Sequence, residues 1–191
     1  VQGADAAAKE IGATDVKIEY GYGNQFYGDA DITAVMDTWY QTLGVQVVFA
    51  CGGAIYTSAA DAAVKVEGAK VIGVDVDQAG LIDSTYGKGL TLTSAMNGLA
   101  ATVNTLLTET TKGNFANYGG KVETLGLVSG EDASLNYVGL PESTQWADAF
   151  TKDDYNKMVA AMFNGEITVS NAIDTEPAVT AVTVEYHGNV K

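Results

Sequence analysis

The segment from Val45 to Gln78 constrains the fold of this chain most, because it reads as strand, glycine turn, helix, strand and acidic loop. The apolar run at 45–50 is rich in β-branched and aromatic residues, which predicts a strand buried on both faces. An alanine-rich stretch at 56–66 predicts a helix, and 71–74 predicts a second buried strand. Two strands joined by a helix are almost always parallel, so the segment predicts an α/β fold.

Ligands of open parallel sheets sit beyond the carboxyl ends of the strands. In this segment the first strand ends at Gly52 and Gly53, where a ligand can approach the backbone without meeting a Cβ atom. The second strand ends at Asp75 and Asp77, whose side chains alternate in direction. One of the two carboxylates can accept hydrogen bonds from vicinal sugar hydroxyls while the other caps a turn. The alternative is that both aspartates simply terminate the strand.

A third loop at the same edge follows the strand predicted at 16–20. It has the sequence GYGNQFYGDAD, in which aromatic side chains alternate with glycines. Phe26 is the best candidate to stack on a flat ligand, with Tyr27 as a second. The alternative is that these aromatic rings cover the edge of the sheet.

The other elements follow from hydrophobic periodicity and from glycine or proline breaks. Asn97 falls in the first turn of the helix predicted at 96–110, where its amide either reaches a ligand or serves as a solvated or capping group. Residues 79–88 resemble a loop, and the C-terminal tail is predicted to be a last strand or a disordered end. Helices are further predicted at 2–11, 31–43 and 153–164, and strands at 89–94 and 121–128.

Composition excludes several classes of function. With 24 acidic and 10 basic residues, the net charge is −14, which argues against nucleic acid and anionic membranes as partners. The only cysteine, Cys51, and the only histidine, His187, cannot build a zinc site or a Cys–His pair. Cys51 ends a strand predicted to be buried and is interpreted as a small hydrophobe. The glycine spacing fits neither a dinucleotide nor a phosphate loop, so no cofactor, metal or catalytic residue is expected.

Several short segments of the chain are distinctive, namely VVFACGG, AAVK, VIGVDVDQ, LTSAM, KVETLGLVSG and NGEITV. They resemble the basic membrane protein (BMP) family of bacterial solute-binding lipoproteins, which includes purine nucleoside receptors of ABC transporters. The resemblance implies a three-layer α/β/α, periplasmic-binding-protein type I fold with a parallel sheet. Family members are larger, with two lobes, which implies that residues 1–90 are a Rossmann-like, ligand-binding C-terminal-lobe domain of an N-terminally truncated protein. Residues 91–191 would be the crossover and the segment returning to the other lobe.

The resemblance also implies roles for particular residues. An aromatic ring that stacks on the base would be Phe26, with Tyr27 as the alternative. The glycine turn near the ribose would be Gly52 or Gly53, and Asp75 would bind ribose hydroxyls. Asn97 stands where the family usually has a lysine, which removes a charge-assisted donor. The ligand is therefore a nucleoside or another sugar-like solute.

The implied function is extracytoplasmic capture of a nucleoside and its delivery to an ABC transporter permease. The protein would be a cell-surface or periplasmic lipoprotein of a bacterium, attached to the membrane only through an anchor absent from this chain. The alternatives are a sugar-binding or ligand-sensing module of the same fold and, less favoured, an enzyme that acts on nucleosides. The residues favour a binding protein, because the sheet edge offers an aromatic ring, glycines and carboxylates without an activated nucleophile or metal cluster.

Overall fold

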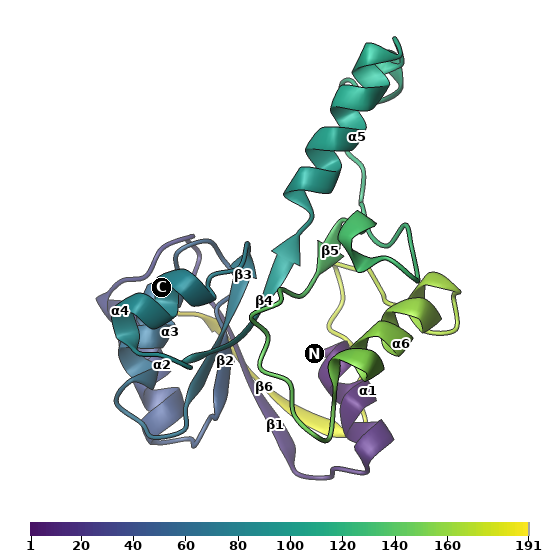
Figure 1. The fold of residues 1–191 in the computed structure, drawn as a ribbon. Helices are drawn as coiled ribbons and strands as arrows, with labels where there is room; N and C mark the ends of the chain where they lie inside the picture. Colours follow the sequence, from purple (N-terminus) through teal and green to yellow (C-terminus); the bar gives the residue numbers. More distant parts are fainter. Residues whose placement is uncertain (191) are drawn as a thin grey trace. The chain divides into compact units, whose positions relative to one another are not determined.

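The structure is a computed structural model that describes residues 1–190 (Figure 1). Helices and strands alternate along most of the chain, and the strand pairing is mainly parallel, which confirms the predicted α/β class. The chain forms two compact units. Unit 1 comprises Val1–Val71 and the C-terminal residues from Val169 onward, and unit 2 comprises Ile72–Thr168.

Unit 1 contains a parallel strand pair formed by residues from opposite ends of the chain (Figure 1). β1 (Val16–Tyr22) pairs with β6 (Val182–Asn189), and Tyr20 lies opposite Tyr186 in the register. The register shifts by one residue immediately after Tyr20. Of the two alternatives for the C-terminal tail, the strand is therefore correct.

A buried carboxylate links helix α1 (Gln2–Ile11) to the segment that leads into β6. Asp5 is 5% exposed and accepts hydrogen bonds from the backbone N–H groups of Thr180 at 2.8 Å and Ala181 at 2.7 Å. The helix ends at Gly12, whose φ of 68° is a conformation that glycine adopts without strain. The predicted helix at 2–11 is confirmed.

Helices α2 (Ala30–Gln41) and α3 (Tyr56–Ala63) pack against each other in unit 1. Asp29 caps α2 by accepting a hydrogen bond from the N–H of Ile32 at 2.9 Å. The alanines of α3 at positions 59, 60, 62 and 63 are fully or almost fully buried, so the two helices can approach closely. Both predicted helices are confirmed.

Strand β2 (Val47–Phe49) lies beside the start of β3, where the N–H of Lys70 donates to the carbonyl of Gln46 at 2.9 Å. Only the middle position of the strand is buried, since Phe49 is 48% exposed. The prediction of burial on both faces is therefore wrong. Cys51, which follows this strand, is exposed rather than part of a core.

Unit 2 contains β3 (Lys70–Asp75), which begins at the unit boundary, followed in order across the sheet by β4 (Thr91–Asn97) and β5 (Val138–Gly139). β4 and β5 are antiparallel. Helix α4 (Ala79–Tyr86) lies against β4 and buries Ile82. The prediction of a loop at 79–88 is wrong, because this short helix follows β3 directly.

Helix α5 (Leu99–Thr111) begins three residues later than predicted. Its apolar side chains Leu99, Val103, Leu106 and Leu107 are exposed. Residues 121–128, predicted as a strand, lie outside the helices and strands of the described chain. Helix α6 (Lys152–Phe163) is confirmed, and it begins with a capping box in which Thr151 and Asp154 exchange hydrogen bonds. Two single-turn 3₁₀ helices, η1 (Phe115–Asn117) and η2 (Ala133–Leu135), complete the unit.

Candidate functional site

Asp75 ends β3 in an uncommon backbone conformation. Its φ is 69°, in the left-handed region that non-glycine residues rarely adopt and that aspartate tolerates better than most. A tight turn follows, in which the N–H of Val76 donates to the carbonyl of Val74 at 2.8 Å. The side chain is half-buried, and its Oδ1 accepts a hydrogen bond from the Asn97 amide at 2.9 Å. The structure thus brings two predicted site residues together at the ends of two neighbouring strands.

Asp77 lies two residues further on and has different partners. Its Oδ1 accepts hydrogen bonds from the Ser143 hydroxyl at 2.7 Å and from the N–H of Ala79 at 3.1 Å. The contact with Ala79 closes a turn at the start of α4, which is the capping role that the sequence left open for one of the two aspartates. Ser143 comes from a segment far away in the sequence and was not among the predicted residues.

The loop that carries both aspartates is held by buried polar groups. Gln78, 7% exposed, accepts a hydrogen bond through Oε1 from the N–H of Val74 at 3.0 Å. Its own backbone N–H donates to the hydroxyl of the fully buried Ser94 at 3.1 Å. A Cβ atom at Gly73 would lie 2.7 Å from both the Gln78 and the Ser94 side-chain oxygens, so this packing requires glycine. Sequence reasoning missed all three residues, because their role depends on contacts between separate strands.

In unit 1, the aromatic loop lies against the glycine turn that follows β2. The carbonyl of Phe26 accepts a hydrogen bond from the N–H of Ala54 at 2.7 Å. A Cβ atom at Gly53 would lie 3.0 Å from the same carbonyl, and the φ of Gly53 is 44°. A Cβ atom at Gly52 would lie 3.6 Å from the Phe26 ring and 2.8 Å from the Ile55 side chain. The two glycines therefore allow the close approach of this loop, and the rings of Phe26 and Tyr27 are 78% and 60% exposed.

The seven predicted residues thus form two local groups. Unit 1 brings Phe26 and Tyr27 to the Gly52–Gly53 turn, and unit 2 brings Asp75 to Asn97, with Asp77 on the same loop. That both groups bind one ligand stays a prediction.

The unit 2 group keeps its negative charge unpaired. Within residues 1–190, no ion pair includes Asp75 or Asp77. The same residues hold no cluster of three or more His, Cys, Asp or Glu side chains that a metal ion would need. The partners of the two carboxylates are neutral hydrogen-bond donors, so this arrangement can accept further donors from a ligand.

The family model described as "Bmp: ABC transporter substrate-binding protein PnrA-like" matches residues 6–171. This chain belongs to the Bmp family. No curated protein sequence matches the chain.

Membership of the Bmp family confirms the resemblance found in the sequence and the type I periplasmic-binding-protein fold class. It also gives the chain the general role of the family, which is extracytoplasmic binding of a solute for an ABC transporter. In the part of the chain that the structure describes, every helix is too short or too polar to cross a membrane.

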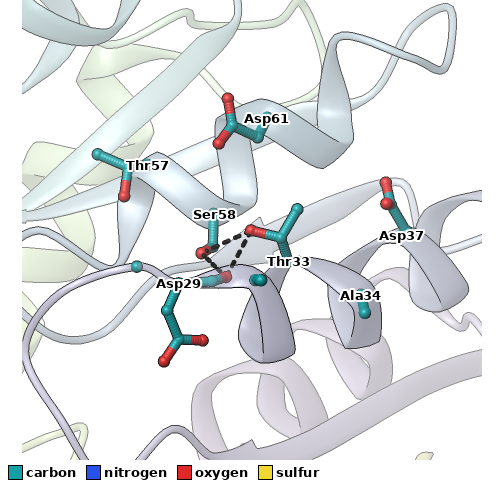
Figure 2. A pocket seen from close by; sticks show the side chains of 9 residues that line it. Asp29, Thr33, Ala34, Asp37, Thr57, Ser58 and Asp61 are labelled. Carbon is teal, nitrogen blue, oxygen red and sulfur yellow. Dashed lines mark hydrogen bonds between the residues drawn. The ribbon is translucent and has the colours of Figure 1, made fainter.

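A hollow of about 470 Å³ lies between α2 and α3 in unit 1 of this Bmp protein (Figure 2). The hydroxyls of Thr33 and Ser58 lie 2.8 Å apart, and both reach the carbonyl oxygen of Asp29, at 2.8 and 3.0 Å. Asp37 on its rim forms an ion pair with Lys65 at 2.8 Å. The polar groups of the hollow thus form hydrogen bonds and an ion pair with one another. None of the predicted ligand-binding residues lines the hollow.

Proposed function

We propose that this protein captures a nucleoside, a purine nucleoside or a related ribosyl compound, and delivers it to the permease of an ABC transporter. The general role follows from the family. The observation that supports a ribosyl ligand is the half-buried Asp75 carboxylate, held at the end of β3 by a neutral amide and without an ion pair among the described residues. An ionised carboxylate can accept hydrogen bonds from two adjacent hydroxyls, and vicinal hydroxyls are the distinctive feature of ribose.

The base of the nucleoside would be bound by unit 1. Phe26 exposes most of its ring on a loop that the Gly52–Gly53 turn supports, and flat aromatic ligands stack on such rings. Tyr27 is the alternative ring. In this proposal residues 1–90 supply the ligand-binding part of one lobe and 91–191 the crossover and the returning segment. The protein would be a lipoprotein at the bacterial surface or in the periplasm.

Binding without turnover distinguishes this proposal from a nucleoside-acting enzyme. Hydrolysis of a nucleoside needs an acid or base beside the glycosidic bond and releases free base, whereas a binding protein returns the nucleoside unchanged. A sugar-binding or ligand-sensing module of the same fold would use the same carboxylates without needing the aromatic loop. Recognition of the base therefore distinguishes a nucleoside-binding protein from a sugar-binding module.

Thermal shift and calorimetry on the protein expressed from its whole natural reading frame test the proposal. Adenosine, guanosine, inosine and D-ribose are the probes, because a ligand that binds only the folded state raises the melting temperature. We expect at least one nucleoside to bind, D-ribose to bind much more weakly, and no free base to appear on prolonged incubation. Equal binding of ribose would favour the sugar-binding alternative, and release of free base would favour the enzyme.

A further inference from the structure

Asn97 is held in a rigid position at the end of β4. Its backbone pairs with Val138 of the antiparallel strand β5, and the next N–H, that of Gly98, donates to the carbonyl of Tyr137 at 2.8 Å. A Cβ atom at position 98 would lie 2.4 Å from the carbonyl oxygen of Asn136, so the two segments pack in direct backbone contact there. The side chain of Asn97 is exposed at this fixed point, and its amide nitrogen donates to Asp75.

Asp75, by contrast, is the last residue of β3 and departs from regular strand geometry. Its backbone is in the left-handed conformation, so its side chain direction differs from that of a regular strand residue. Its Oδ1 accepts the hydrogen bond from the Asn97 amide at 2.9 Å, and an ionised carboxylate has several further lone pairs to offer. The direction in which those lone pairs point therefore depends on Asn97.

We propose that Asn97 is a positioning residue that aims the Asp75 carboxylate at the hydroxyls of the ligand. The proposal rests on the proposed nucleoside-binding function and gives Asn97 a role different from direct ligand contact. A neutral amide suits this role, because it holds Oδ1 without cancelling the negative charge that binds hydroxyl donors. Asp77 is held in a parallel way by the neutral hydroxyl of Ser143 at 2.7 Å.

The consequence is a specific effect on ribose recognition. If Asn97 aims the carboxylate at both vicinal hydroxyls, loss of its amide weakens binding of ribonucleosides and leaves 2′-deoxyribonucleosides, which present one hydroxyl fewer, much less affected. A merely structural role would weaken both ligands equally or lower the melting temperature. The ratio of the two affinities therefore reports on positioning alone.

The test uses calorimetry on the same full-length protein with the tightest binder among adenosine, guanosine and inosine and with its 2′-deoxy counterpart. In Asn97→Leu, which has similar volume and no donor, we expect the ribo-to-deoxy affinity ratio to fall about tenfold, the size of one hydrogen bond to a charged group. In Asn97→Asp the ratio falls further, because two carboxylates then repel each other. Asn104→Asp on the exposed surface of α5 makes the same charge change and leaves the ratio unaltered.

The outcomes distinguish the positioning role of Asn97 from nucleoside capture itself. If the wild type binds ribonucleosides and Asn97→Leu keeps the wild-type ratio, the positioning role is overturned and nucleoside capture stands. If the wild type binds none of the three nucleosides, nucleoside capture itself fails and the role of Asn97 fails with it. Melting temperatures of Asn97→Leu and Asn97→Asp near that of wild type establish that the fold is intact, as expected for an exposed side chain.

Discussion

The two groups of candidate ligand-binding residues are built by opposite means. In unit 1, the turn at Gly52 and Gly53 lacks side chains, and this absence lets the backbone at Phe26 approach while its ring stays exposed. In unit 2, side chains determine the geometry, since Asn97 holds Asp75 and buried Gln78 and Ser94 hold the loop. The first group offers an apolar, uncharged surface, and the second offers negative charge with precise direction. In the proposed function, the first group would stack on the base and the second would accept hydrogen bonds from the sugar.

The sharpest test of this division is Asp75→Asn. The substitution keeps the shape of the side chain and its half-buried position but removes the negative charge that accepts hydrogen bonds from ligand hydroxyls. We expect ribonucleoside affinity to fall on the order of 100-fold, because two hydrogen bonds to a charged group are weakened, each contributing about 1.5 kcal/mol. Calorimetry measures the change, and Asp148→Asn, an exposed aspartate of the same unit, is the control. An unchanged ribonucleoside affinity would show that Asp75 does not bind the sugar.

The second test concerns how the loop of unit 2 is supported. Gly73→Ala places a Cβ atom 2.7 Å from two buried side-chain oxygens, those of Gln78 and Ser94. Overpacking of this kind destabilises a fold by about 1–3 kcal/mol. Chemical denaturation measures the loss. Gly80→Ala is the matched control, because a Cβ atom there has open space and α4 gains the better helix former, so stability rises by about 0.5–1 kcal/mol. Equal effects of the two substitutions would contradict the described packing.

The contrast between these glycines also shows what the sequence alone can predict. The β3 strand, the acidic loop after it and the Gly52–Gly53 turn follow from local patterns, and they were placed correctly. Asn97 was predicted in the first turn of a helix, but it is the last residue of β4. The strand extends that far because Asn97 pairs with Val138, some forty residues away in the sequence. The neighbouring Gly98 permits that pairing, and no local sequence pattern indicates this role of the glycine.

Helix α4 was missed for a related reason. It has eight residues, its N-cap residue Gln78 makes no side-chain cap, and glycine stands at its second position. Local propensity is weak there, and the helix depends on the burial of Ile82 against the rest of unit 2. For β2 the sequence predicted too much burial. Its apolar pattern predicted a strand covered on both faces, whereas Phe49 is half exposed. Periodicity identifies elements, whereas the neighbours that cover them are a tertiary property.

The third test addresses unit 1. Phe26→Ala removes a ring that is 78% exposed, so the fold should lose little stability. If the ring stacks on the base, nucleoside affinity falls roughly tenfold, since stacking of a base on an aromatic side chain contributes about 1–3 kcal/mol. Calorimetry with one nucleoside and with D-ribose separates the effects, because ribose has no base to stack. Phe115→Ala, at another exposed phenylalanine, is the control. Equal losses for nucleoside and ribose would assign Phe26 a structural role.

The smallest expected effect is an acid-induced loss of stability that both units share. In unit 1, hydrogen bonds from the Lys9 side chain and from the N–H groups of Ala181 and Thr180 lower the pKa of Asp5 from its usual 3.8. In unit 2, hydrogen bonds from the side chain and backbone of Thr151, followed by one from Lys157, lower the pKa of Asp154 to about 2.

A carboxylate whose pKa is lower in the folded than in the unfolded state stabilises the fold above its unfolded pKa, and this contribution disappears as the pH falls through the folded pKa. We therefore expect the melting temperature to fall as the pH decreases from about 4 to about 2. Asp154→Asn should melt lower than wild type at neutral pH and lose less in that window, and Asp5→Asn should behave likewise. Wild-type-like acid sensitivity in both variants would show that other carboxylates dominate. A smaller loss in one variant alone would identify which unit is the more acid-sensitive of the two.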